Sequence, residues 1–197
     1  MNQIEILQAD CAAHDVRISA GEWAGLAGSF SPRSFKKKSV LISQTEICNE
    51  VYYVADGILA SEFVVDARSD ISRYFRKGNY STNIVSAARR TLASDNVIAL
   101  TDVAVVAMPY EWLIQQYLRG GAFGEFIRLK ILSTLLEDKS FVSIKTFNDT
   151  EMKYRFLVQE YPDVVEDVSD RHLAAFLGIS PEALSRFLSR RKKNQKT

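Results

Sequence analysis

Apolar residues recur at helical spacing within the first 30 residues. The apolar positions are Ile4, Leu7, Cys11, Trp23, Leu26 and Phe30. Such spacing places them on one side of two short predicted helices. The run SFKKKSV follows at 34–40. Its three lysines are typical of a solvated turn ahead of a strand, which we favour over a basic binding patch.

From Val40 the pattern changes to short runs of β-branched and aromatic residues. The runs are Val40–Ile42, Val51–Val54, Ile58–Val65, Ile71–Phe75, Val97–Leu100 and Val103–Met108. Turn residues separate them, and Asp56-Gly57 between two of the runs is typical of a β-hairpin. Closely spaced short strands over roughly 70 residues predict a small antiparallel barrel or jelly roll. Such a fold either encloses a pocket or serves as a plain scaffold.

Helical spacing returns at Tyr110. Glu111–Leu118 is one predicted helical piece, Gly120-Gly121 interrupts it, and Ala122–Ser140 is a longer predicted helix. The apolar residues of this longer helix cover too wide a stripe for a single buried face. One side would cover the barrel and the other would meet a second copy of the chain, which we favour over complete burial within one subunit. A further helix is predicted to end at Tyr161-Pro162.

The segment 168–193, VSDRHLAAFLGISPEALSRFLSRRKK, predicts two short helices joined by a tight turn. Gly178 supplies the left-handed conformation of the turn, and Ser180 is a predicted N-cap ahead of Pro181. The second helix has an apolar side made of Leu184, Phe187 and Leu188, and a polar side made of Glu182, Ser185, Arg186, Ser189 and Arg190. This pattern is typical of a helix-turn-helix whose second helix enters the DNA major groove.

Positive charge is concentrated at the end of the sequence. Residues 186–197 hold six Lys and Arg and no acid, whereas residues 1–185 hold 19 Lys and Arg and all 24 Asp and Glu. The net charge of the whole chain is only +1. An ordinary helical hairpin with solvated charges would explain the two helices alone. Cations gathered around one helix favour phosphate binding instead.

Composition excludes several classes of protein. With 197 residues, 47% of them hydrophobic, the chain can bury a sizeable core in one or two domains. Cys11 and Cys48 are far apart and predict reduced thiols rather than a disulfide or a metal site. No apolar run reaches ~18 residues and no signal-peptide pattern is present, so we expect a cytoplasmic protein without a membrane span. We expect no enzyme, because nucleophile motifs, metal-ligand spacings and glycine-rich phosphate loops are absent from the sequence.

A barrel, a long helix and a C-terminal helix-turn-helix, in this order, resemble the Crp/Fnr superfamily of bacterial transcription regulators. The residues that carry the resemblance are LISQTEICNEVYYVADGIL (41–59), FRKGN (75–79), KYRFLVQEYPDV (153–164) and RHLAAFLGISPEALSRF (171–187). The resemblance implies an α+β chain. Its parts are an N-terminal double-stranded β-helix (jelly-roll) sensor domain of the cyclic-nucleotide-binding type at 1–121, a dimerisation helix and linker at 122–145, and a winged-helix-like helix-turn-helix domain at 146–197.

On the second helix of the motif, the resemblance implies base-reading roles for Glu182 and Arg186. Arginine can bridge guanine O6 and N7, and glutamate can accept a hydrogen bond from the cytosine amino group. Pro181 stands where the catabolite-activator branch has a second base-reading arginine, so we expect a different target sequence. Further expected contacts to bases or phosphates are Ser169, Arg171, His172, Ser180, Ser185, Ser189, Arg190, Arg191, Lys192 and Lys193.

The sensor half departs from the family's pattern. In the family, a Gly-Glu pair holds the ribose hydroxyl, and an arginine ten residues after the glutamate neutralises the cyclic phosphate. A gap-free alignment puts Thr82 and Asn83 on Gly-Glu and Ala93 on the arginine, and a three-residue shift gains Arg90 but puts Tyr80 on the acid. A buried phosphate without its arginine would lose roughly 1.5–3 kcal/mol. We therefore expect no tight binding of cyclic AMP or cyclic GMP.

Other effectors and partners follow from the same comparison. The nearest polar candidates for a different effector are Asn83, Arg89, Arg90 and Ser94; alternatively, side chains fill the roll and no effector binds. An iron–sulfur cluster needs about four thiolates, more than the two cysteines supply, and we expect no cofactor and no metal. We expect a homodimer on a palindromic DNA duplex, with RNA polymerase as a further candidate partner. The rival hypothesis is a small-molecule sensor or protein-interaction module with a degenerate DNA-binding domain.

Overall fold

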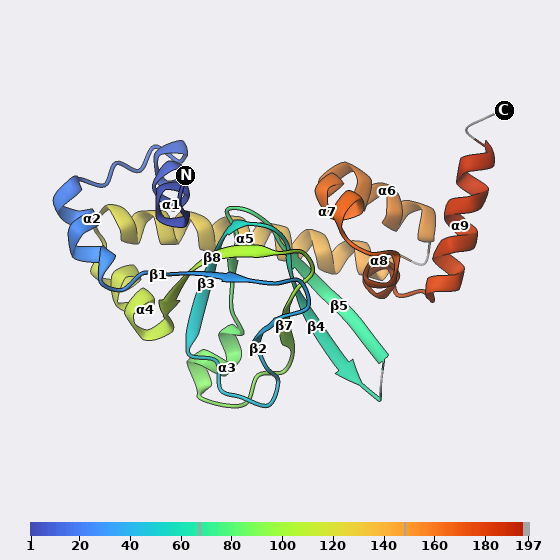
Figure 1. The fold of residues 1–197 in the computed structure, drawn as a ribbon, viewed down its shortest axis with the longest axis horizontal. Helices are drawn as coiled ribbons and strands as arrows, with labels where there is room; N and C mark the ends of the chain where they lie inside the picture. The colour runs from blue at the N-terminus through green and yellow to red at the C-terminus, as the bar shows by residue number, and fades with distance from the viewer. Residues whose placement is uncertain (67, 148, 195–197) are drawn as a thin grey trace.

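The computed structural model describes residues 1–66, 68–147 and 149–194, with the backbone alone for Val65, Arg68 and residues 192–194. Within these ranges, eight strands form two antiparallel sheets of four strands each, which face each other as a jelly roll (Figure 1). The first sheet has the order β1 (Ser31–Phe35), β8 (Val103–Pro109), β3 (Glu50–Asp56) and β6 (Tyr80–Ser81). The second has the order β2 (Val40–Ile42), β7 (Asn96–Ala99), β4 (Leu59–Val65) and β5 (Arg68–Phe75). The predicted α+β fold with a jelly roll is confirmed.

Strand β8 shows why several runs read as continuously apolar. Val103 and Val105 point into the space between the sheets, whereas Val106 and Met108 belong to a second cluster beneath the N-terminal helices. Successive side chains of a strand point to opposite faces, and here both faces are covered. Both apolar clusters of the roll therefore depend on this central strand.

Two turn predictions had different outcomes. The turn within 34–40 forms as expected, but it is preceded by β1, which pairs with β8 from Ser31 opposite Ala107. The sequence pattern did not indicate β1, because most side chains of this strand are exposed. The prediction of a hairpin at Asp56-Gly57 is wrong, since β3 and β4 lie in different sheets. At Gly57 the chain instead crosses from the first sheet to the second. The φ of Gly57 is +83°, and a Cβ at this position would lie 2.3 Å from the backbone oxygen of Asp102.

Three helices cover the outer face of the first sheet near the N-terminus. They are α1 (Gln3–Ala13), α2 (Ala20–Ala27) and α4 (Tyr110–Arg119). Asn2 and Glu5 form a capping box at the start of α1, and Ser19 and Glu22 form another at the start of α2. Buried residues of all three helices share one apolar cluster with β3 and β8. The two helices predicted within the first 30 residues are thus confirmed.

The long helix α5 (Gly121–Thr146) runs along the roll from the N-terminal helices to the C-terminal ones (Figure 1). It is six residues longer at its C-terminal end than the predicted helix 122–140. Phe126 and Ile127 are buried against the roll, whereas Leu132 and Leu136 on the other side are 56% and 63% exposed. Within one chain, the alternative of a completely buried helix is therefore excluded.

In the described ranges, four helices follow α5, pack together and share one core with the roll. They are α6 (Thr150–Glu160), α7 (Pro162–Asp167), α8 (Asp170–Leu177) and α9 (Pro181–Asn194). Pro162 ends α6 as predicted and also begins α7, because proline is favourable at a first helical position. Tyr74 of β5 and Phe176 of α8, with ring centroids 5.1 Å apart, belong to one core shared by roll and helices. The Tyr74 hydroxyl donates to the carbonyl oxygen of His172 at 3.1 Å.

Candidate DNA-binding surface and effector cavity

Helices α8 and α9 meet at the predicted tight turn. Gly178 ends α8 at φ +71°, and its backbone N–H returns to the carbonyls of Ala174 and Ala175. The Ser180 hydroxyl accepts from the backbone N–H of Ala183 at 3.2 Å, which caps the start of α9. The turn therefore has the conformation of a helix-turn-helix.

The two sides of α9 are separated as its pattern predicts. Leu184 is fully buried in the core shared with the roll, and Phe187 and Leu188 are partly buried against the same core. The predicted contact residues that are exposed are Ser169, Arg171, Ser180, Glu182, Ser185, Arg186, Ser189 and Arg190. Burial of three apolar side chains thus fixes which side of α9 faces solvent.

The exposed side of α9 carries the charged residues Glu182, Arg186 and Arg190. The pKa of Glu182 is lowered, first by its own backbone N–H, then by the Ser180 hydroxyl and the Arg186 guanidinium. Glu182 is therefore a carboxylate at neutral pH and can accept hydrogen bonds. In the part of the chain with described side chains, Arg186 and Arg190 make no hydrogen bond or ion pair. Both guanidinium groups have their donors available.

Two predicted contact residues are engaged within the protein. The Arg191 guanidinium lies 2.5 Å from a carboxylate oxygen of Glu151 and 5.2 Å from the ring centroid of Tyr154. The ring of His172 is half-buried beside the roll and lies 2.9 Å from the Ser169 hydroxyl. Burial lowers the pKa of His172, so its ring is neutral at pH 7. The side chains of Lys192 and Lys193 lie outside the described residues.

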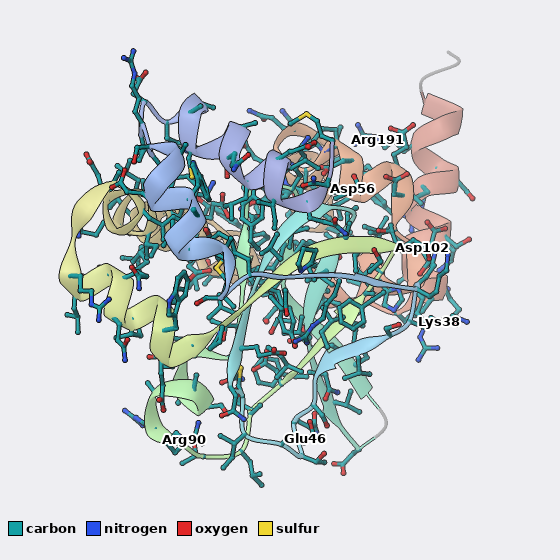
Figure 2. All side chains as sticks on the ribbon, turned by 60° about the vertical axis from the view of Figure 1, so that its left-hand side comes forward. Lys38, Glu46, Asp56, Arg90, Asp102 and Arg191 are labelled. Atoms are coloured by element: carbon teal, nitrogen blue, oxygen red, sulfur yellow. The ribbon has the colours of Figure 1, made fainter. Side chains whose placement is uncertain are left out.

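The four predicted effector residues do not come together. Arg89 and Arg90 are exposed at the end of α3 (Ile84–Arg89), and the Arg90 side chain contacts Asn49. Figure 2 places Arg90 at the end of the roll farthest from Arg191 of α9. Asn83 and Ser94 do meet, because both donate to the same oxygen of Asp95, at 2.5 and 2.7 Å.

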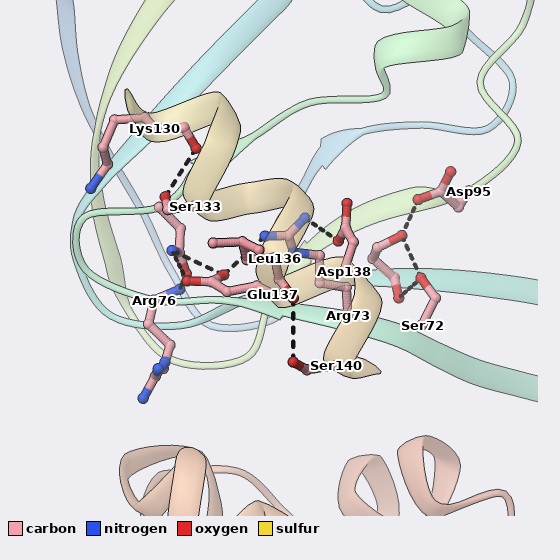
Figure 3. A network of polar contacts seen from close by, with 12 residues as sticks. Ser72, Arg73, Arg76, Asp95, Lys130, Ser133, Leu136, Glu137, Asp138 and Ser140 are labelled. Carbon is pink, nitrogen blue, oxygen red and sulfur yellow. Dashed lines mark hydrogen bonds and ion pairs between the residues drawn. The ribbon is translucent and has the colours of Figure 1, made fainter. Parts of the chain in front are cut away.

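The carboxylate of Asp95 is the centre of a network that the sequence did not suggest. Asp95 is 9% exposed, and its second oxygen accepts from the buried Ser61 hydroxyl, to which Ser72 donates in turn (Figure 3). The side-chain oxygen of Asn83 caps α3 by accepting from the backbone N–H of Ser86 at 3.0 Å. The roll thus holds a carboxylate of its own beside α3. A Ser-Asp pair ahead of a strand, at 94–95, was the only signal and is a common one.

A cavity of about 660 Å³ lies between α5 and the roll. Residues of β4, β5, β6 and α5 line it, among them Ser61, Ser72 and Arg73. Of the predicted effector residues, none lines this cavity. The sequence did not indicate Arg73, because its partners Glu137 and Asp138 are 64 and 65 residues away.

The described residues contain no group of three or more His, Cys, Asp or Glu side chains arranged to hold a metal ion. In the same part of the chain, no helix combines the length and the apolar character needed to cross a membrane.

Comparison with known proteins supports the observed fold. Residues 32–120 match the cyclic nucleotide-binding domain family. A CooA mutant from Carboxydothermus hydrogenoformans is similar in structure, with a TM-score of 0.71 at 17% identity over 98% of this chain and 85% of that one. The c-di-GMP responsive global regulator CLP of Xanthomonas campestris has a TM-score of 0.65 at 18% identity over 90% of this chain and 93% of that one. No curated protein matches the sequence.

A third similar structure is a Crp/Fnr family transcriptional regulator from Eubacterium rectale, with a TM-score of 0.66 at 12% identity over 90% of this chain and 85% of that one. The domain match confirms the predicted cyclic-nucleotide-binding-type domain, and these neighbours share the fold of the whole chain. They establish the fold, in which a cyclic nucleotide-binding domain precedes the C-terminal helices.

Proposed function

We propose that this chain, with its cyclic nucleotide-binding domain at residues 32–120, is a homodimeric, sequence-specific DNA-binding transcription regulator of the Crp/Fnr type that does not respond to cyclic AMP. The observation that carries the proposal is the polar side of α9. Its apolar side is anchored in the core, while Glu182, Ser185 and Arg186 remain exposed on the other side. This arrangement suits a helix that lies in the major groove.

The roles of these side chains follow from their chemistry. Arg186 would donate to guanine O6 and N7, and the ionised Glu182 would accept from a cytosine amino group. Arg190, one turn further along α9, would neutralise a phosphate and carry no sequence information. Arg191 is held by Glu151 within the domain, so its share of the phosphate contacts would be small.

Dimerisation through α5 is supported by the apolar side chains that one chain leaves uncovered. Those more than one-third exposed on α5 are Leu129, Ile131, Leu132, Leu135, Leu136 and Val142. Contiguous exposed apolar patches on a helix mark interaction sites. Two copies paired along this stripe would carry two α9 helices to palindromic half-sites about 34 Å apart. The division into a sensor domain at 1–121, a dimerisation segment at 122–145 and a DNA-binding domain at 146–197 belongs to the same proposal.

Selection of bound duplexes from a random DNA pool tests DNA recognition. We expect an enriched palindrome whose half-sites are about 10–10.5 base pairs apart. On that duplex, Arg186→Ala should cost about 1–3 kcal/mol and relax the preference at one base pair. Arg190→Ala is the matched control, and it should weaken specific and random DNA alike. Failure to enrich any sequence would reject sequence-specific binding and favour the rival hypothesis of a sensor or interaction module.

Sedimentation of the full chain tests the dimer separately. We expect a dimer for the natural chain and a monomer for Leu132→Asp and Leu136→Asp, because a carboxylate placed in the apolar stripe would be desolvated on pairing. Glu125→Ala, an exposed position on the same helix, should leave the dimer intact. A monomeric natural chain at the concentrations used for DNA binding would contradict this part of the proposal.

A further inference from the structure

The cavity between α5 and the roll has the size and lining of a small-molecule site. Its volume of about 660 Å³ falls within the range of roughly 300–1,000 Å³ typical of ligand pockets. Most of its lining is apolar: Val51, Phe75, Ile84, Leu113, Ile114, Ile127, Ile131, Leu135, Phe141 and Val142. Apolar walls of this extent favour a ligand that is mostly apolar itself.

An ion-paired arginine stands in one wall of the cavity. Arg73 lines the cavity and is only 9% exposed. Two of its nitrogens donate to Asp138 and Glu137 of α5, as Figure 3 shows. Among the described residues, its third nitrogen, Nε, is buried without an acceptor. The guanidinium is thus held in place by both acids of α5, and its positive charge is already neutralised.

The charges around the cavity disfavour an anion. Each cation in its wall is already paired: Arg73 with Glu137 and Asp138, Lys130 with Asp10 at 3.1 Å, and Lys145 with Asp70 at 2.9 Å. Asp95 adds a carboxylate whose hydrogen-bond donors, Ser61, Asn83 and Ser94, are all uncharged. The three cations of the wall are therefore neutralised by their own partners, and an anion in the cavity would be desolvated without a free cation to pair with.

We propose that this cavity binds an uncharged, mostly apolar small molecule and that it rejects anionic nucleotides. The proposal names the effector class of the regulator proposed above. Binding is measured without DNA, so the two proposals fail separately.

The neutral, mostly apolar dye Nile red is a suitable probe for titration of the full chain followed by fluorescence. We expect saturable binding of one dye per chain. Ser72→Phe and Thr134→Phe would fill the cavity from opposite walls, β5 and α5. Each should weaken dye binding by at least about tenfold, or 1.4 kcal/mol. If the dye merely coated apolar surface, an added phenylalanine would leave binding unchanged or strengthen it.

Leu118→Gln is the matched control, because Leu118 is 74% exposed on α4 and does not line the cavity. It should leave dye affinity unchanged. Cyclic AMP in large excess should fail to displace the dye, whereas the neutral apolar N-phenyl-1-naphthylamine should displace it. Circular dichroism checks that each variant folds, and the stoichiometry of the natural chain decides the outcome even if one variant does not. Unsaturable binding, an equal loss with Leu118→Gln, or displacement by cyclic AMP would each overturn the proposal.

Discussion

Replacing Asp95 by alanine removes the acceptor at the centre of the polar network in the roll. The carboxylate accepts from Asn83, which is 6% exposed, from Ser61, which is 7% exposed, and from the exposed Ser94. Ser94 can turn to water after the change. The buried donors on Asn83 and Ser61 cannot, and each donor left without an acceptor costs about 1–3 kcal/mol. We therefore expect Asp95→Ala to lower the free energy of unfolding by about 2–6 kcal/mol.

Asp95→Asn separates the loss of acceptors from the loss of volume. Asparagine has nearly the same shape and keeps one oxygen, so it still serves one of the two buried donors. Its expected cost is about 1–3 kcal/mol, which is one unsatisfied donor. Glu125→Ala, which removes an exposed acid from α5, is the surface control and should change stability by less than about 0.5 kcal/mol.

Urea unfolding followed by tryptophan fluorescence, through Trp23 and Trp112, measures these differences as shifts of the midpoint at constant slope. The expected order of stability is Glu125→Ala, then Asp95→Asn, then Asp95→Ala. If Asp95→Ala were as stable as the surface control, the buried donors would have found other acceptors. The inference that Asn83 and Ser61 depend on this carboxylate would then be wrong.

Three further changes test other parts of the fold. Gly57→Ala should destabilise the protein by more than about 1 kcal/mol because of its positive φ and the neighbouring backbone oxygen, whereas Gly25→Ala, in the open middle of α2, should stabilise it by about 0.5–1 kcal/mol in urea unfolding. Burial lowers the pKa of His172, so the folded protein binds fewer protons than the unfolded chain just below its ordinary value of 6.5. Stability should therefore fall as the pH drops through about 6.5, and His172→Asn should lack this part of the dependence when unfolding is measured at several pH values. Leu184→Ala should cost about 2–5 kcal/mol by leaving a cavity under α9, whereas Ser185→Ala on the exposed side should change urea stability by less than about 0.5 kcal/mol.

Elements with a regular apolar period were predictable from the sequence. The strand runs between Val40 and Met108, the two N-terminal helices, the long helix and the two helices around Gly178 all occur in the structure. The helices alternate between a covered and an uncovered face, whereas β3 and β8 are covered on both faces and form apolar runs, and both patterns are visible in the sequence. Strand β1 lacks such a period because it lies at a sheet edge with most side chains in solvent. Helix α7 was missed because Pro162 was read only as the end of a helix.

The two candidate sites differ in how far apart their residues lie in the sequence. The polar side of α9 lies within one helix, so its spacing alone groups Glu182 and Arg186. The cavity depends on residues of β5 and α5 that lie more than 60 positions apart in the sequence, such as Arg73 and Glu137. The resemblance to the Crp/Fnr superfamily drew attention to Arg89 and Arg90, but the turn at the end of α3 points them outward. Only the folded chain shows that Asp95 lies in the roll interior.

Because side chains alternate along β5, the alignment of this strand with β4 determines which of them face the cavity and which face the C-terminal helices. Arg73 faces the cavity, and its neighbour Tyr74 is buried in the core shared with α8. A slip of one residue would exchange these surroundings, putting a guanidinium into an apolar core and an aromatic ring beside the carboxylates of α5. The bulge between Ser61 and Glu62 is where the pairing of β4 with β5 changes phase. An insertion or deletion in this hairpin would therefore damage both the cavity beside α5 and the core on which the C-terminal helices pack.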